Sequence, residues 1–406
     1  MQTAALRNRN YLIYFIGNTV SLHGLWVYRV ALGWLAWQLT ESEFWVGAVA
    51  FTQFAPAVLF GPIFGVLADR FDRRAASLLI NSLSTLNMSV LALLTMLGKT
   101  DIYVLCLLAL MQGTLDGAHM PVRMSLVPNL VTRVQLQSAL ATNSISFNLS
   151  RFVGPAISGL LIATLGVSSA FAFNALSYVA ILSALLVVKL NPTCYDREPR
   201  NDVWREMTEG MRYAFTHREI RPLLAIIAVA SVLGRGPLEM LPAFADAVFA
   251  RGSAGLAILT SAIGAGAILA GLILMRGTAW LRLQIVAGGV LAGGVLLMLL
   301  GSSDAFWLSV AVVAMLGFML SITGVGSQIL LQTIVEDRLR GRVSSFWGVI
   351  AFGGTALGGL LIGSLASLYG LQRVTLLTGV TCTVLVFLII LQSRGASRRR
   401  HDADPH

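Results

Sequence analysis

Twelve apolar stretches, most of them long enough to cross a lipid bilayer, recur along this chain of 406 residues. A membrane-spanning helix needs about 20 mostly apolar residues. Because lipid offers no hydrogen-bond partners to the backbone, only helices and closed barrels span membranes, and stretches this long are typical of helices. The predicted cores are residues 11–36, 45–66, 75–97, 102–120, 139–163, 170–188, 222–247, 254–275, 283–300, 306–331, 343–367 and 372–391. The sequence therefore predicts an all-α integral membrane protein with twelve transmembrane helices.

The composition supports this class and excludes others. Hydrophobic residues make up 56% of the chain and charged residues 12%, whereas soluble domains carry about 25% charged residues. The net charge of +10 could indicate a nucleic-acid partner, but the basic residues gather in loops between spans and in the C-terminal tail. They do not form the basic face of a nucleic-acid-binding protein, so no nucleic acid is expected as a partner.

Lysine and arginine set the expected orientation, because cytoplasmic loops of membrane proteins carry an excess of these residues. With the N-terminus inside and the spans alternating, the inner segments hold 23 of the 29 basic residues. The outer loops hold Lys99, Arg251 and Arg373, and the spans hold Arg29, Arg151 and Arg235. If one span were added or removed, the basic residues would no longer gather on one side of the membrane. Their uneven distribution therefore supports twelve spans with both termini in the cytoplasm.

A polar segment divides the spans into two groups of six. Within it, apolar residues recur at Trp204, Met207, Met211 and Phe215, and this spacing predicts an amphipathic helix on the inner membrane face. The predicted organisation is an N-terminal six-helix bundle over 1–190, a cytoplasmic linker over 191–221, a C-terminal six-helix bundle over 222–393 and a cytoplasmic tail over 394–406.

The two groups of spans resemble each other at a shift of 204 to 206 residues. At this shift Arg29 matches Arg235, and Gly154 matches Gly358. Such matches support a duplicated six-helix unit. In transporters built from two parallel repeats, the substrate site lies near the bilayer midplane at the interface between the repeats.

A charged loop, Gly65-Val66-Leu67-Ala68-Asp69-Arg70-Phe71-Asp72-Arg73-Arg74, lies between the second and third spans. It resembles the motif Gly-x-x-x-Asp-Arg-x-Gly-Arg-Arg of the major facilitator superfamily, with Asp72 in place of the family's last glycine. The alternative is a short cytoplasmic loop that carries arginines for orientation alone. The resemblance implies the major facilitator fold and a gating loop, in which Asp69 contacts the region of residues 339–343. The gating residues are Gly65, Asp69, Arg70, Arg73 and Arg74.

Two further stretches resemble motifs of the superfamily. Gln112-Gly113 matches the Gln-Gly of its helix 4 motif, but Ala109 stands at the motif's arginine, so that arginine's role in proton handling does not carry over. The stretch Gly154-Pro155-Ala156-Ile157-Ser158-Gly159 resembles the end of the helix 5 motif of exporters, Gly-Pro-x-x-Gly-Gly. The resemblance implies export through Gly154, Pro155 and Gly159, and the alternative is close helix packing through small residues.

The stretch Trp26-Val27-Tyr28-Arg29-Val30-Ala31-Leu32, followed by Thr40-Glu41-Ser42, is similar to a bacterial branch that includes the enterobactin exporter and macrolide efflux proteins. The resemblance implies proton-driven export of a small organic molecule, siderophore-like or drug-like, across the bacterial inner membrane. It implies a monomer whose partners are its substrate, protons and membrane lipid. Neither a cofactor nor a metal is expected.

Ionisable residues inside spans are candidate functional residues, because each costs about 2.5–3.5 kcal/mol to insert at the centre of a helix. Arg29 and Arg235 occupy matching places in the two spans that line the central cavity of the superfamily. A pair of cavity arginines predicts an anionic substrate, and the alternative is that each arginine is neutralised within its own half. Arg151 and Gln112 are assigned to the same cavity, and the alternative for Arg151 is an ion pair with Asp116.

Asp116 and Glu239 are the acids deep within spans, so they are the candidate proton carriers. A carboxyl group in a low-dielectric surrounding can exchange a proton near neutral pH. Glu239 lies one turn after Arg235, and the two can also pair. The run from Gly234 to Pro237 interrupts the helix, and irregular backbone is tolerated in a membrane where it lines a cavity. Residues 233–240 are therefore expected to form part of the substrate path.

Two other classes of function are weighed against export. A nutrient importer or symporter would have the same fold, and the helix 5 motif is the feature that argues against it. A membrane enzyme or receptor is disfavoured, because no span carries a Ser/His/Asp set, an HExxH motif or clustered metal ligands. No loop or tail has the length of a signalling domain.

Overall fold

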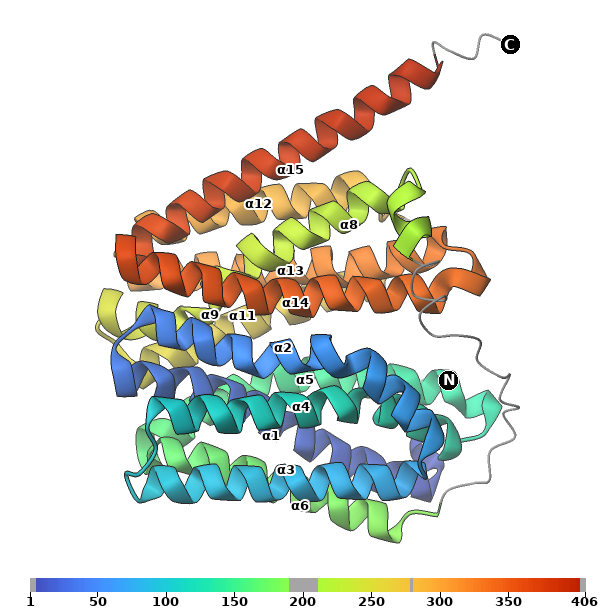
Figure 1. Cartoon of the computed structure of the whole chain (residues 1–406), viewed down its shortest axis with the longest axis vertical. Coiled ribbons are helices and arrows are strands. Elements are labelled where there is room, and N and C mark those ends of the chain that lie inside the picture. The colour runs from blue at the N-terminus through green and yellow to red at the C-terminus, as the bar shows by residue number, and fades with distance from the viewer. Residues whose placement is uncertain (1–4, 190–210, 278–279, 402–406) are drawn as a thin grey trace. The chain divides into compact units, whose positions relative to one another are not determined.

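The computed structural model describes residues 5–189, 211–277 and 280–401 of the chain. Within these ranges, the side chains of residues 62, 65–70, 125, 133, 148, 337, 338, 340–342 and 393–401 are not described. Helices make up nearly all of the described residues, which contain no strand (Figure 1). The predicted all-α class is confirmed.

The helices follow the predicted spans closely. The first six are α1 (Arg9–Thr40), α2 (Glu43–Arg70), α3 (Arg73–Met96), α4 (Ile102–Leu126), α5 (Arg133–Leu165) and α6 (Val167–Val187). A broken helix over residues 220–248 comes next, followed by α11 (Gly252–Met275), α12 (Leu283–Ser302), α13 (Phe306–Ile334), α14 (Asp337–Tyr369) and α15 (Leu371–His401). Each predicted core overlaps one of these helices, which confirms the twelve-helix prediction.

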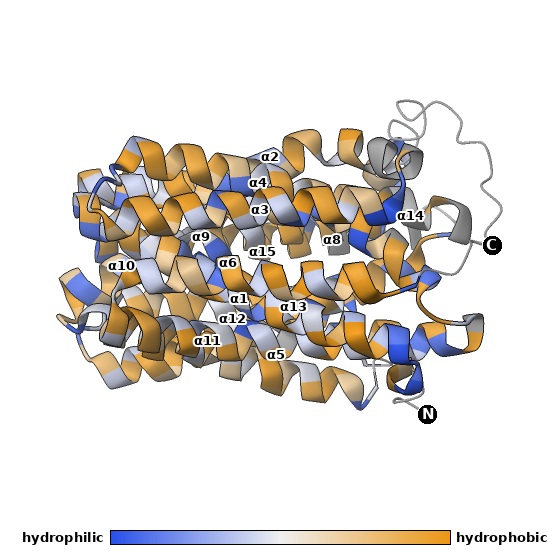
Figure 2. Cartoon of the chain, turned by 90° about the horizontal axis from the view of Figure 1, so that it is seen from below, coloured by the Kyte–Doolittle hydropathy of each residue, from blue (hydrophilic) through white to orange (hydrophobic). Residues whose placement is uncertain are grey.

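Eleven of the described helices are long and apolar enough to span a membrane. The twelfth, α1, is more polar, because its 32 residues include buried Asn18 and Ser21 and the cation Arg29. Figure 2 shows hydrophobic residues along most of the length of the helices and hydrophilic residues toward many helix ends. Large apolar side chains such as Leu59, 68% exposed, lie on the surface in numbers that mark contact with lipid.

The chain forms two compact units. The first comprises Met1–Asp196 and Leu241–Gly264, and the second comprises Arg197–Met240 and Ala265–His406. In the first unit, α1 packs against α5 and α6, α2 against α4, and α3 against α4 and α6. In the second unit, α12 packs against α13 and α15, and α14 packs against α15. The division at 190/191, 221/222 and 393/394 stays a prediction.

Aspartates fix where two of the helices begin. Asp101 accepts a hydrogen bond from the backbone N–H of Val104 at 2.8 Å and caps α4. Asp72 accepts one from the backbone N–H of Ala75 at 2.7 Å and caps α3. Aspartate is among the best residues at a helix N-cap. Asp72, which stands where the superfamily motif has glycine, therefore has a local structural role.

The seventh span is broken, as the run from Gly234 to Pro237 predicts. It consists of α8 (Ile220–Val229), a π-helical segment η3 (Ala230–Arg235), α9 (Gly236–Glu239), α10 (Leu241–Ala243) and a second π-helical segment η4 (Phe244–Val248). Wide π-turns are rare and occur frequently at functional sites. The first of them ends at the intramembrane cation Arg235.

The predicted amphipathic helix over residues 204–217 lies partly outside the described residues. Its later part, residues 211–216, is helical. Ala214 is buried, whereas Met211 and Phe215 are exposed. The ring of Phe215 lies 5.7 Å from the ring of Phe346 on α14, measured between centroids.

Candidate substrate and proton site

Gln112, whose side chain is fully buried on α4, is the centre of a polar network in the first unit. Its Nε2 donates to Oδ1 of Asp116 at 3.0 Å and to the hydroxyl of Tyr178 on α6 at 2.9 Å. Its Oε1 accepts a hydrogen bond from Nδ2 of Asn87 on α3 at 3.2 Å. Asn87 on α3 and Tyr178 on α6 thus fix the side-chain amide of Gln112 on α4. The amide in turn binds Oδ1 of Asp116.

The second carboxyl oxygen of Asp116 is different. Oδ2 is buried and has no hydrogen-bond partner among the described residues. The hydroxyl of Tyr28, fully buried on α1 and in electrostatic interaction with Asp116, also lacks a partner there. A buried polar group without a hydrogen bond costs roughly 1–3 kcal/mol. A proton, a water molecule or a polar group of a substrate would therefore be stabilised at this place.

Arg29 lies between two aromatic rings. Its Cζ is 4.9 Å from the ring centroid of Trp26, one turn earlier on α1, and 5.1 Å from that of Phe54 on α2. Cation–π contacts of this kind are worth about 0.5–2 kcal/mol. Nε of Arg29 is buried without a hydrogen-bond partner in the described structure, and Asp116 interacts with the guanidinium electrostatically. The two rings therefore orient a cation that has one buried donor without a hydrogen-bond partner among the described residues.

Arg151 lies over the same indole from α5, with its Cζ 5.6 Å from the ring centroid of Trp26. One turn further, a Cβ on Gly154 would overlap the Cβ of Trp26. Ser158 donates its hydroxyl to the carbonyl oxygen of Val27 at 3.0 Å. The exporter-like stretch, residues 154–159, thus packs α5 closely against α1. Close helix packing is the alternative to an export role that the sequence analysis named for this stretch.

The other two residues of that motif are also packed. Pro155 and Gly159 are both buried, and a Cβ on Gly159 would overlap the Cβ of Ala257 on α11. The implication of export through these residues stays a prediction, because close packing accounts for their contacts.

Arg235, at the matching place in the second unit, has other surroundings. It interacts electrostatically with Glu239, one turn later in the broken helix. Gly324 on α13 leaves room for its guanidinium, because a Cβ there would lie 3.1 Å from Nη2 of Arg235. The structure thus places an acid next to Arg235 and aromatic rings around Arg29.

The gating loop is described in part. Arg74 donates from Nη2 to the carbonyl oxygen of Leu186 at the end of α6, at 2.5 Å, and Arg73 begins α3. The side chains of residues 65–70, which include Gly65, Asp69 and Arg70, lie outside the described part. The contact expected for Asp69 stays a prediction.

Two further polar residues of α1 bind structural partners. Nε1 of Trp37 donates to Oδ2 of Asp246 at 2.9 Å, near the end of the broken helix. Nδ1 of His23 lies 2.8 Å from the carbonyl oxygen of Thr19 and 3.1 Å from Oγ of Ser150. His23 is therefore a hydrogen-bonded packing residue between α1 and α5.

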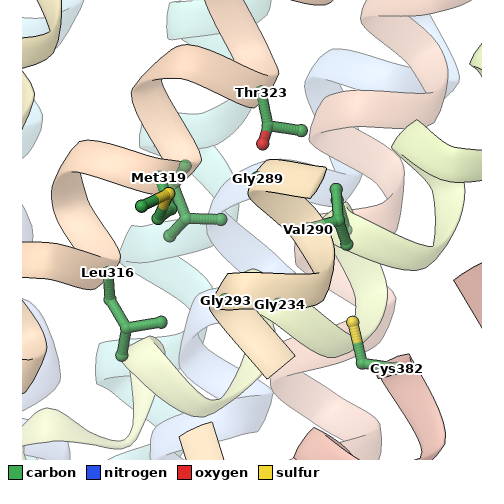
Figure 3. Close-up of a pocket in the computed structure, with 10 residues that line it drawn as sticks. Gly234, Gly289, Val290, Gly293, Leu316, Met319, Thr323 and Cys382 are labelled. Atoms are coloured by element: carbon green, nitrogen blue, oxygen red, sulfur yellow. The ribbon is translucent and has the colours of Figure 1, made fainter. Parts of the chain in front are cut away.

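A cavity of about 10 Å³ lies in the second unit. Figure 3 shows Leu316, Met319 and Val290 around this space, with Thr323 and Cys382 further along its wall. The wall is almost wholly apolar, and the space holds about one water molecule. The cavity is too small for an organic substrate, so the candidate site lies elsewhere.

Sequence reasoning missed four residues that surround Arg29 and Gln112. Trp26 had a local signal, because it lies three residues before Arg29 and shares its helix face. Phe54, Asn87 and Tyr178 come from other helices, and no short spacing marks them. In the described part of the chain, no group of three or more His, Cys, Asp or Glu side chains is placed to hold a metal ion.

The twelve helices and the polar residues buried among them define an integral membrane transporter of the major facilitator superfamily. A family model described as transmembrane secretion effector matches residues 1–405. The chain therefore belongs to the transmembrane secretion effector family of that superfamily. It is a multi-pass membrane transporter for a small molecule and not an enzyme.

Two curated relatives are named as a staphyloferrin A transporter and an enterobactin exporter. The staphyloferrin A transporter of Staphylococcus aureus (strain NCTC 8325 / PS 47) is 23% identical over 392 residues, which cover 93% of this chain and 95% of that protein. The enterobactin exporter EntS of Escherichia coli O1:K1 / APEC is 26% identical over 374 residues, 87% of this chain and 84% of that protein.

Solved structures share the fold at low identity. A bacterial homologue of the human lysosomal transporter Spinster, in an inward-facing and occupied conformation, gives a TM-score of 0.76 at 14% identity, over 95% of this chain and 97% of that one. The nucleoside transporter NupG gives a TM-score of 0.74 at 14% identity, over 94% and 98% of the two chains.

Proposed function

We propose that this protein is a secondary active transporter that exports a small organic anion, siderophore-like or drug-like, across the bacterial inner membrane in exchange for protons. The resemblance of residues 154–159 to the exporter motif supports the direction, as does the relative named as an enterobactin exporter. The distribution of lysine and arginine supports cytoplasmic termini. The transporter acts as a monomer.

One observation carries this proposal. The first unit contains a cation and an acid in electrostatic interaction inside the membrane, and each has a buried atom without a hydrogen-bond partner in the described structure: Nε of Arg29 and Oδ2 of Asp116. Arg29 is the partner for an anionic substrate, and Asp116 is the carrier of a proton. Because the two groups interact, a ligand at one of them changes the affinity at the other, and this coupling is reciprocal.

Alternating access of the two six-helix repeats moves the substrate. The bundles over 1–190 and 222–393 are the moving parts, and the linker over 191–221 joins them. At the inner membrane face, a latch controls the change between the two states of alternating access. It is formed by Asp69 with Arg70, Arg73 and Arg74. Arg235 completes the substrate cavity in the second repeat, and Glu239 balances its charge.

An accumulation screen tests the proposal. A deletion strain and its parent are compared across siderophores, macrolides and dyes, with and without a protonophore. We expect the deletion strain to retain one class of acidic compound that the parent expels, and we expect the protonophore to abolish the difference. A compound that the parent accumulates and the deletion strain does not would identify an importer instead.

A further inference from the structure

The first π-helical segment of the broken helix, η3, packs tightly against α14. A Cβ on Gly354 of α14 would lie 2.6 Å from the Cβ of Ser231, and a Cβ on Gly358 would overlap the carbonyl oxygen of Val232. Small residues at such a contact let two helix backbones approach each other closely. One side of η3 is therefore held firmly by its neighbour.

Another side of η3 borders empty space. Ala230 and Gly234, which lie four residues apart, line the cavity of about 10 Å³ together with Gly289 and Gly293 of α12 (Figure 3). Gly293 is buried, and a Cβ there would have no atom of another helix within 4 Å. Protein interiors are normally close-packed, so this void leaves η3 room to move on the side away from its tight contact.

A change in η3 would move the cation at its end. A π-helical segment can become α-helical when i→i+4 hydrogen bonds replace its i→i+5 bonds. Each residue of an α-helix turns the chain by about 100° and advances it by about 1.5 Å, so this conversion shifts whatever follows. Arg235 is the last residue of η3. Gly324 on α13 leaves room for its guanidinium, because a Cβ there would lie 3.1 Å from Nη2.

We propose that η3 is a hinge, which converts between the π and the α form during transport and uses the cavity as the space for its moving side chains. The conversion carries Arg235 between two positions relative to α13. The inference rests on the proposed function and deepens it, because it names the segment that moves the arginine of the second repeat. Hinges of this kind are a few residues that absorb a change of backbone conformation.

Hydrogen exchange of the purified full-length protein in detergent tests the hinge without any substrate. Each conversion breaks the hydrogen bonds that η3 makes, and amides in segments that open locally exchange faster than those of stable helices. The amides of residues 230–240 should therefore exchange at least about tenfold faster than those at the centre of α6, a regular helix.

Variants of the cavity wall assign this exchange to the void. Gly293→Ala places a methyl group, about the size of a water molecule, in the cavity and should slow the exchange of residues 230–240 at least about fivefold. Gly288→Ala is the matched control, because Gly288 lies in the same helix, is exposed and has nothing within 4 Å of a Cβ. Both variants gain the same helix propensity, and the control should exchange as the wild type does.

A second variant changes the cavity in the opposite direction. Leu316 is buried in the wall, and Leu316→Val enlarges the void by one methylene group. It should speed the exchange of residues 230–240 more than that of α6. This variant decides the question if Gly293→Ala does not fold.

Efflux connects the hinge to transport. Gly293→Ala should lower the maximal rate of efflux of the acidic compound found in the accumulation screen at least about fivefold, at an equal protein level and without a fall in thermal stability, because a filled void blocks the conversion. Gly288→Ala should transport as the wild type does. A cavity that is only a packing defect would give a more stable Gly293→Ala protein with unchanged efflux.

The inference is overturned if residues 230–240 exchange as slowly as the centre of α6, or if neither Gly293→Ala nor Leu316→Val changes their exchange. It is also overturned if Gly293→Ala slows exchange and leaves efflux unchanged. Failure of the proposed function has a different signature: the accumulation screen would identify an importer or no acidic compound, while the exchange measurement would still decide whether η3 is a hinge.

Discussion

Nε2 of Gln112 donates a hydrogen bond to Oδ1 of Asp116 at 3.0 Å, and Oδ2 of the same carboxyl group is buried without a partner among the described residues. A hydrogen bond to the ionised form favours that form. The unpartnered oxygen can accept a proton without the loss of an existing hydrogen bond. This arrangement suits a carboxyl group that alternates between two protonation states.

Asp116→Asn should therefore remove the dependence of efflux on pH and leave energy-independent exchange of substrate. Asparagine keeps the shape of the side chain but carries no proton that can be released. Efflux from preloaded cells across a series of external pH values measures the effect. Glu239→Gln is the comparison and should keep the wild-type profile, because Glu239 interacts with Arg235. A wild-type profile for Asp116→Asn would exclude this acid as the proton carrier.

Arg29→Lys should weaken the apparent affinity for an anionic substrate by about tenfold and change the maximal rate less. Lysine keeps the charge but loses the planar group that lies between Trp26 and Phe54. Arg29→Ala should nearly abolish transport of the same substrate. Initial rates over a range of substrate concentrations measure both effects. Unchanged efflux of a permanent cation by Arg29→Ala would show that Arg29 is a structural residue.

Gly154→Ala should reduce the apparent affinity for substrate without a direct contact to it. Its Cβ would overlap that of Trp26, and overpacking of this kind typically costs about 1–3 kcal/mol. Gly61→Ala on α2 is the matched control, because a Cβ there has nothing within 4 Å. Thermal unfolding and transport are measured for both variants. Equal behaviour of the two would contradict the close packing of α5 onto α1.

Asp72→Ala should lower the free energy of unfolding by about 1 kcal/mol, because alanine cannot cap α3. Asp72→Asn should be nearly neutral, and Asp72→Gly, which restores the glycine of the superfamily motif, should cost a few tenths of a kcal/mol. Thermal unfolding of the purified variants gives the order of their stabilities. If Asp72→Asn lowers the free energy of unfolding as much as Asp72→Ala does, then the charge of Asp72 stabilises the protein and its capping hydrogen bond does not.

Most of the fold could be predicted from the sequence, because a bilayer imposes one requirement on every span. Each predicted core overlaps a helix, and the run from Gly234 to Pro237 correctly marked the break in the seventh span. By composition, α1 is the hardest of the twelve helices to recognise as a membrane span, because it contains polar residues. Two of these residues, Asn18 and Ser21, are buried.

The candidate site could be predicted only where its partners lie on one helix. Gln112 and Asp116 are four residues apart, and Arg235 and Glu239 have the same spacing, so their interactions follow from helix geometry. Two of the neighbours that distinguish Arg29 from Arg235 come from other helices: Phe54 from α2 and Gly324 from α13. No local pattern in a sequence reports which helices pack together, and so this difference needed the structure.

Proton flux in everted membrane vesicles tests the central claim most directly. Vesicles that contain the wild-type protein are acidified inside by respiration, and the anionic substrate found in the accumulation screen is then added outside. The account predicts that substrate enters the vesicles while protons leave them, and that Asp116→Asn abolishes the proton movement at an equal level of protein. Substrate entry without proton exit, or proton exit that persists in Asp116→Asn, would contradict it.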